Sequence, residues 1–167
     1  MLTEYTLVAI GANLPSPTHG PPRATCEAAL AELSRRGLRI VRRSRWYESA
    51  PVPLADQPWY VNGVVAVETD LSPEDLLALL HDVECQFGRE RRELNAARVL
   101  DLDLLAYGDL VREAPPPILP HPRLAERAFV VLPLADVAPD WWHPVTGQSV
   151  ADMRRALPAD QAIRPLA

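Results

Sequence analysis

The sequence predicts a single domain of mixed α and β structure. Its 167 residues match the usual length of one domain and suffice to enclose a hydrophobic core. Strand character is found in four segments, at 5–10, 38–47, 60–69 and 98–107. The apolar spacing of a helix is found in three others, at 23–36, 72–87 and 124–137. Because the two kinds of segment are interspersed along the chain, we expect strands and helices to share one core.

The composition limits the class of protein. A net charge of −5 argues against nucleic-acid binding as the main activity, and no apolar run reaches the roughly 18 residues of a membrane span. All 17 basic residues are arginines, which excludes a lysine-containing phosphate loop and Schiff-base chemistry. Cys26 and Cys85 occupy apolar positions of predicted helices, and we expect both to pack in the core of a cytoplasmic protein.

The strand predicted at 60–69 carries one polar residue in an apolar context. Asn62 follows Tyr60 by two residues, so the ring and the amide share one face of the strand. A buried amide either satisfies backbone groups or binds the edge of a heteroaromatic ligand, and the residues alone leave both possibilities open. The proline-rich segment 48–59 before this strand is long for a connection, and such loops are often functional.

The clearest helix is predicted to begin at the cap residue Ser72 and to end before Gly88. His81 and Glu84 lie near its end. The following segment, 89–98, has no hydrophobic period and contains four arginines. A mixed-charge run is usually a solvated linker, but arginines beside a metal site can bind polyphosphate oxygens with paired hydrogen bonds.

Two carboxylates follow in the strand R-V-L-D-L-D-L-L-A-Y at 98–107. Successive side chains of a strand alternate between faces, so Asp101 and Asp103 are expected side by side, with leucines opposite. Neighbouring carboxylates repel each other unless a cation compensates them, and a carboxylate pair can hold Mg²⁺ for phosphoryl transfer. The alternative is an edge strand with a solvated polar face.

The region after this strand supplies further polar candidates. Gly108 and Asp109 predict a hairpin that returns through residues 110–111. His121 lies between two prolines, and this rigid position suits either a phosphate contact or a backbone contact. The helix predicted over 124–137, with an interruption near Pro133, carries Arg127 and Phe129.

Four segments, taken together, resemble the family of 6-hydroxymethyl-7,8-dihydropterin pyrophosphokinase, an enzyme of folate synthesis. They are G-A-N-L at 11–14, D-Q-P-W-Y-V-N at 56–62, F-G-R-E-R…A-R-V-L-D-L-D-L-L at 87–105 and P-H-P-R-L-A-E-R-A-F-V-V-L-P-L at 120–134. The resemblance implies a ferredoxin-like α+β fold: a four-stranded antiparallel core sheet with an added hairpin and helices on its faces. It also implies a monomer that transfers pyrophosphate from ATP to the hydroxymethyl group of the pterin and releases AMP.

The resemblance further implies roles for individual residues. Asp101 and Asp103 would bind two Mg²⁺ ions, and Arg89 and Arg98 would assist catalysis. The pterin would be bound by Ser49, Ala50, Val52, Tyr60, Asn62 and Phe129, with its ring between Tyr60 and Phe129. ATP would be bound by His81, Glu84, Arg91, Arg98, His121 and Arg127.

The chain departs from the family pattern mainly near the arginine-rich segment. Leu94 stands where the family often has an arginine, and Val99 where a threonine is common. These changes are expected to affect loop closure or ATP binding. Two other functions are compatible with the same residues, namely a non-catalytic module that binds pterin or nucleotide and an unrelated Mg²⁺-dependent phosphotransferase on this scaffold.

Overall fold

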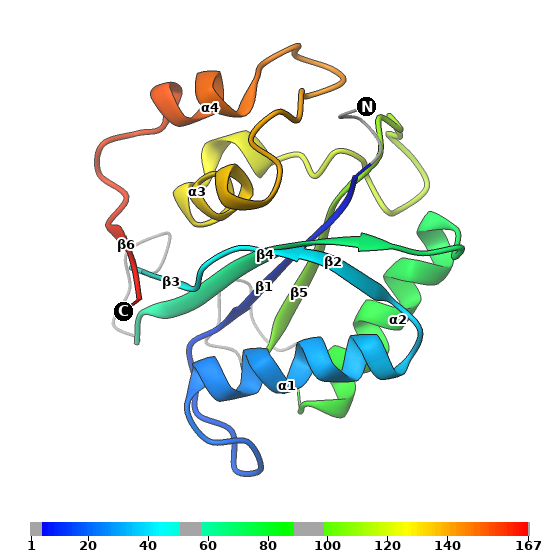
Figure 1. Ribbon diagram of the computed structural model, residues 1–167, viewed down its shortest axis with the longest axis vertical. Coiled ribbons are helices and arrows are strands. Elements are labelled where there is room, and N and C mark those ends of the chain that lie inside the picture. Colours follow the sequence, from blue (N-terminus) through cyan, green and yellow to red (C-terminus); the bar gives the residue numbers. More distant parts are fainter. Residues whose placement is uncertain (1–4, 51–57, 89–98, 167) are drawn as a thin grey trace.

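The computed structural model describes residues 5–50, 58–88 and 99–166, which form an antiparallel sheet with helices on both faces (Figure 1). Its strands are β1 (Thr6–Ala12), β2 (Arg39–Arg43), β3 (Tyr47–Ser49), β4 (Tyr60–Glu68), β5 (Asp101–Tyr107) and β6 (Ile163–Pro165). They lie in the order β5–β1–β4–β3–β6, and β2 pairs with β4 as well. The predicted α+β class is confirmed, but the sheet has six strands where a core of four was expected.

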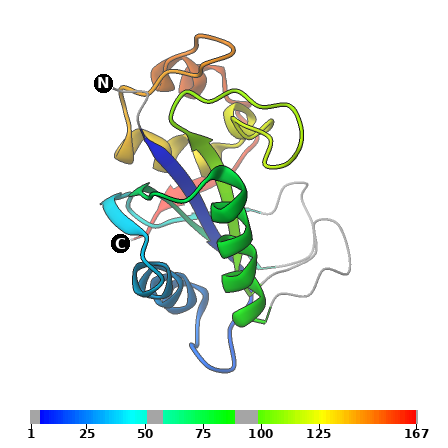
Figure 2. The same ribbon diagram turned by 90° about the vertical axis from the view of Figure 1, so that its right-hand side faces the viewer.

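Two hydrophobic cores lie on the two faces of this sheet. Helices α1 (Pro22–Arg35) and α2 (Pro73–Gln86) cover one face, where they bury Val8 and Ile10 of β1. Helices α3 (Ala128–Val137) and α4 (Val150–Ala156) lie over the other face, where Leu7 and Val64 are buried (Figure 2). Both faces of β1 and β4 are therefore covered. None of the helices in the described part of the chain has the length and hydropathy of a membrane span.

Local signals account for the start of α2. The hydroxyl of Ser72 accepts a hydrogen bond from the backbone N–H of Asp75 at 3.1 Å, as predicted for a cap residue. The prediction for the cysteines is half right, because Cys26 is buried while Cys85 is exposed. Each residue of a helix advances by about 100° around its axis. Since Val83 and Glu84 face the sheet, residue 85 is turned away from it.

Two predicted details of the later chain are wrong. Pro133 lies inside α3 and does not interrupt it; the break comes at Arg127, which is extended between a 3₁₀ turn (Leu124–Glu126) and α3. Pro133 costs the helix a hydrogen bond, but buried neighbours such as Val131 and Leu134 hold it against the sheet. The turn after β5 does not lead into strand pairing at 110–111; an isolated bridge pairs Arg112 with Leu119 instead.

Gly63 is required by the packing of Trp46 on β4. A Cβ atom at position 63 would lie 2.6 Å from Cζ3 of Trp46, whose indole N–H donates to Glu27 at 2.7 Å. We expect Gly63→Ala to lower the free energy of unfolding by about 1–3 kcal/mol, because the indole has to move out of its site. Urea unfolding measures this change. A loss of the same size in a Trp46→Leu background would contradict this explanation.

Candidate active site

A row of side chains crosses the face of the sheet that α3 covers. Asp101 of β5 pairs with Gly11 of β1, Gly11 pairs with Asn62 of β4, and Asn62 pairs with Tyr47 of β3. Directly paired residues of neighbouring strands point to the same face, so Asp101 and Asn62 share this face, as does Asp103 further along β5. A Cβ atom on Gly11 would lie 3.0 Å from Oδ1 of Asn62. The absence of a side chain at Gly11 thus permits the close approach of the Asn62 amide to β1.

The two aspartates alternate with leucines as predicted. Asp101 and Asp103 are partly buried, and Leu100, Leu102 and Leu104 lie in the opposite core under α1 and α2. β5 is the last strand of the sheet in the described part of the chain. The aspartates therefore lie on an edge strand, but on a face that is neither fully solvated nor filled with apolar side chains.

Glu84 supports this strand from the other layer of the fold. Its side chain is 1% exposed, and Oε2 accepts a hydrogen bond from the backbone N–H of Leu102 at 2.8 Å. Because Leu102 stands between Asp101 and Asp103, this bond fixes the backbone from which both carboxylates project. The structure thus turns one oxygen of Glu84 toward β5, and the predicted contact of Glu84 with a nucleotide stays a prediction.

Arg127 and His121 bring positive charge and hydrogen-bond donors to the aspartates. The backbone N–H of His121 donates to the carbonyl of Leu105 at 2.8 Å, which fixes this loop beside β5. Burial lowers the pKa of the Arg127 guanidinium, while Asp103 and Asp101 act in the opposite direction and favour its charged form. The same guanidinium lies 5.4 Å from the centre of the Phe129 ring. Arg127 therefore adjoins both the carboxylate pair and an aromatic ring.

His121 is a neutral donor at physiological pH. Burial, followed by the charges of Arg127 and Arg123, lowers the pKa of its imidazole to about 4, against the opposing effect of Asp101. Nδ1 accepts a hydrogen bond from the backbone N–H of Arg123 at 3.1 Å. The proton of the neutral ring therefore lies on Nε2, which can donate it to an anionic oxygen.

The low pKa of His121 makes stability depend on pH. Between the ordinary value of 6.5 and about 4, the unfolded chain binds a proton that the folded chain excludes, so the free energy of unfolding falls as the pH falls. When the pH falls from about 7 to about 5, the free energy of unfolding of the His121→Gln variant should decrease by about 1–2 kcal/mol less than that of the wild type. Urea unfolding at both pH values measures the two losses, and equal losses would contradict the assignment.

The residues predicted to bind the pterin lie on two parts of this face, which we call the two walls of the predicted site. The first wall is on the strands: Tyr60 begins β4, and Asn62 donates from Nδ2 to the hydroxyl of Ser49 at 2.6 Å. Asn62 and Ser49 are both buried. The second wall is Phe129, in the first turn of α3, which packs over β4. Two aromatic residues on neighbouring elements, together with a buried amide, are groups that suit a flat heteroaromatic ligand.

Not every predicted residue can be placed in this cluster. Val52, Arg89, Arg91, Arg98 and Leu94 lie outside the described residues. His81 lies on α2, which covers the other face of the sheet. Val99 is partly buried just before β5.

Other residues near the cluster were missed by the sequence analysis. The hydroxyl of Tyr47 donates to Asp136 of α3 at 2.8 Å, which ties that helix to β3. Gln161 contacts the backbone on both sides of Arg127. Local patterns carry no signal for such pairs, because Tyr47 and Asp136 are 89 positions apart.

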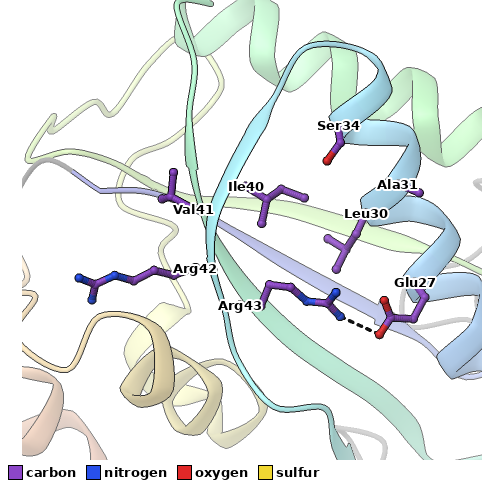
Figure 3. Close-up of a pocket in the computed structure, with 8 residues that line it drawn as sticks. All are labelled: Glu27, Leu30, Ala31, Ser34, Ile40, Val41, Arg42 and Arg43. Atoms are coloured by element: carbon purple, nitrogen blue, oxygen red, sulfur yellow. Dashed lines mark hydrogen bonds and ion pairs between the residues drawn. The ribbon is translucent and has the colours of Figure 1, made fainter.

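A separate groove of about 460 Å³ lies between α1 and β2 (Figure 3). Arg43 and Glu27 form an ion pair of 2.7 Å across it, and Leu30 and Ile40 line its apolar part. β2 lies on the far side of β4 from β5, so this groove is not part of the aspartate cluster.

The clustered side chains first define a class of protein. Two carboxylates on a strand, beside an arginine and a neutral histidine and on the same face as aromatic side chains, suit an enzyme that transfers phosphoryl groups to an organic acceptor. The chain belongs to the family of 7,8-dihydro-6-hydroxymethylpterin-pyrophosphokinases (HPPK), whose sequence model matches residues 7–139. The predicted family and the predicted enzyme class, a pyrophosphokinase of folate synthesis, are thereby confirmed.

Individual relatives agree with this assignment. The chain is 41% identical to the 2-amino-4-hydroxy-6-hydroxymethyldihydropteridine pyrophosphokinase of Pseudomonas aeruginosa over 158 residues. These residues cover 94% of each of the two chains. The enzyme of the same name from Synechocystis sp. is 39% identical over 148 residues, 88% of this chain and 73% of that one. The structure of wild-type HPPK-DHPS from Plasmodium falciparum has a TM-score of 0.68 at 15% identity, which shows a shared fold. The match covers 90% of this chain but only 40% of that longer chain.

Proposed function

We propose that this protein transfers the pyrophosphoryl group of ATP to the hydroxymethyl group of 6-hydroxymethyl-7,8-dihydropterin, giving the pterin diphosphate and AMP. The observation that carries the proposal is the row that joins Asp101, Gly11 and Asn62 across three strands. It sets a carboxylate pair beside a buried amide on one face of the sheet. A donor polyphosphate and a heteroaromatic acceptor could thus meet without a large movement of the framework.

Asp101 and Asp103 are proposed to hold two Mg²⁺ ions. The donor set suits this hard cation, since both ligands are carboxylates and both are partly buried. Among the described residues no group of three or more His, Cys, Asp or Glu side chains could hold a metal alone, so phosphate oxygens and water would complete the coordination. Bound Mg²⁺ supplies positive charge that offsets the charge of the phosphates.

The protein's own groups are proposed to orient the phosphates. Arg127 can turn its guanidinium from the aspartates toward a phosphate, and His121 can donate from Nε2. Arg89, Arg91 and Arg98 are proposed to contact the polyphosphate as well, and His81 and Glu84 the rest of the nucleotide. Phosphoryl transfer proceeds through a loose transition state, so positioning and positive charge suffice without a strong base.

The pterin is proposed to lie between the rings of Tyr60 and Phe129. Asn62 would bind its polar edge, together with backbone groups of Ser49, Ala50 and Val52. The hydrogen bond from Asn62 to Ser49 supports this role, because it fixes the orientation of the amide before the ligand arrives.

The remaining features are proposed from the fold. The strand order β5–β1–β4 supports a ferredoxin-like core. In this core, β2 and β3 both pair with β4 and together take the place of the fourth strand. We propose that the chain acts as one domain and as a monomer in the cytoplasm.

The decisive experiment measures AMP release from ATP with Mg²⁺ and 6-hydroxymethyl-7,8-dihydropterin. We expect turnover that depends on all three components. Pterin binding without turnover would favour a non-catalytic module. ATP-dependent transfer to other acceptors, without pterin binding, would favour an unrelated phosphotransferase.

A further inference from the structure

The C-terminal segment 161–165 connects the two walls of the proposed pterin site. We propose that Gln161 is a positioning residue, which acts through this segment to fix the separation of the walls and so the affinity for the pterin. This inference rests on the proposed function, because it assumes that a pterin occupies the space between Tyr60 and Phe129.

Gln161 holds the second wall through both ends of its amide. Oε1 accepts a hydrogen bond from the backbone N–H of Ala128 at 2.8 Å, and Nε2 donates to the carbonyl of Glu126 at 2.7 Å. These two backbone groups flank Arg127, and Phe129 follows directly. The side chain thus satisfies two backbone groups at the break between the 3₁₀ turn and α3, and one of them is the N–H of the first residue of the helix.

The next residues hold the first wall. The carbonyl of Ala162 accepts from the backbone N–H of Ala50 at 3.0 Å, and Ile163 pairs with Ser49 where β6 joins β3. Arg164 adds an ion pair with Glu48, and its guanidinium lies 5.3 Å from the ring of Trp59, the neighbour of Tyr60. Figure 1 shows this segment running down to β3 and ending in β6.

The connection is short, because Gln161 binds one wall and Ala162 binds the other. A ring that stacks between two aromatic side chains gains contact on both faces only when their separation matches its thickness. Without the Gln161 bonds, the start of α3 would be held to the sheet by side-chain packing and by bonds near the far end of the helix, from Tyr47 and Arg45 to Asp136 and from Arg42 to the carbonyl of Val137. We therefore expect the loss of the two Gln161 hydrogen bonds to weaken pterin binding more than nucleotide binding.

The test compares Gln161→Met, which keeps the length of the side chain but loses both hydrogen bonds, with Gln161→Glu, which keeps only the accepting half. Binding of 6-hydroxymethyl-7,8-dihydropterin is measured by calorimetry, and KM and kcat by AMP release. We expect Gln161→Met to raise Kd and KM for the pterin about five- to tenfold, with kcat and the KM for ATP changed by less than about twofold. Gln161→Glu should give a smaller rise, and Gln148→Met, in the partly exposed loop before α4, should give none.

A double-mutant cycle separates positioning from general stability. If Gln161 acts through the second wall, its effect on pterin Kd should largely disappear in a Phe129→Ala background. An unchanged Kd in the folded Gln161→Met protein, or an effect that persists in full without Phe129, would overturn the inference. If the wild type neither binds nor converts the pterin, the proposed function itself fails, and the wild-type measurement shows this before any variant is compared.

Discussion

Replacing Asp103 by alanine should lower kcat/KM for pyrophosphoryl transfer by at least about a thousandfold. A metal-bound phosphate gains several kcal/mol of charge stabilisation in the transition state, and about 4 kcal/mol corresponds to this factor. Asp103 shares its face with Asp101 and faces Arg127, so its loss would leave one carboxylate to hold metal against an unbalanced arginine. AMP release over a range of Mg²⁺ concentrations measures the effect.

The fold of this variant should stay intact. Asp103 is partly exposed and lies outside both hydrophobic cores, so we expect the free energy of unfolding to change by no more than about 1 kcal/mol. Asp109→Ala is the matched control, because Asp109 is exposed in the turn just after the same strand. Near-normal Mg²⁺-dependent turnover in folded Asp103→Ala would show that the pair is not the metal site.

Replacing Phe129 by alanine should raise the Kd for the pterin by about 5- to 150-fold. Stacking of a base on an aromatic side chain contributes about 1–3 kcal/mol, and a pterin presents a similar flat heterocycle. The change would also remove the ring that lies under the Arg127 guanidinium. Calorimetric titration with pterin, with and without an ATP analogue, measures the loss.

Two further variants separate stacking from apolar burial. Phe129→Leu restores most of the apolar volume without a flat ring, so it should recover stability more than pterin affinity. Trp142→Ala removes an aromatic residue that is 51% exposed, and it should leave the affinity unchanged. If Phe129→Ala bound the pterin as tightly as the wild type, Phe129 could not be the second wall.

The parts of the fold that the sequence predicted are those governed by local rules. The cap at Ser72 and the alternation of aspartates and leucines in β5 each depend on neighbours within a few residues, and both are found in the structure. Pro133 shows where such rules fail. Its local cost is real, but burial of α3 against the sheet outweighs it, and this packing cannot be read from the segment alone.

The candidate site shows the same division. Asp101, Asp103, Asn62 and His121 could be identified within their own segments, and the resemblance to a family gave Arg127 and Phe129 their roles. Their proximity depends on register: Gly11 has to oppose Asn62 and Asp101 at once. The supports of the site depend on tertiary contacts, since Glu84 reaches the strand from another layer and Gln161 from the end of the chain. No local pattern indicates either contact.

The hydrogen bond from Leu102 to Glu84 has a consequence beyond the geometry of the aspartates. An edge strand with unpaired backbone groups can add a strand from another molecule, which is a common start of aggregation. Here the buried carboxylate of Glu84 occupies one such N–H group, and α2 packs along β5. The carbonyl of Leu105 also accepts from the backbone N–H of His121, so part of the outer backbone of β5 is already hydrogen-bonded, while small ions can still approach its side-chain face. The chain can therefore carry its carboxylate pair at the rim of the sheet while fewer backbone groups of that rim are open to pairing with another strand.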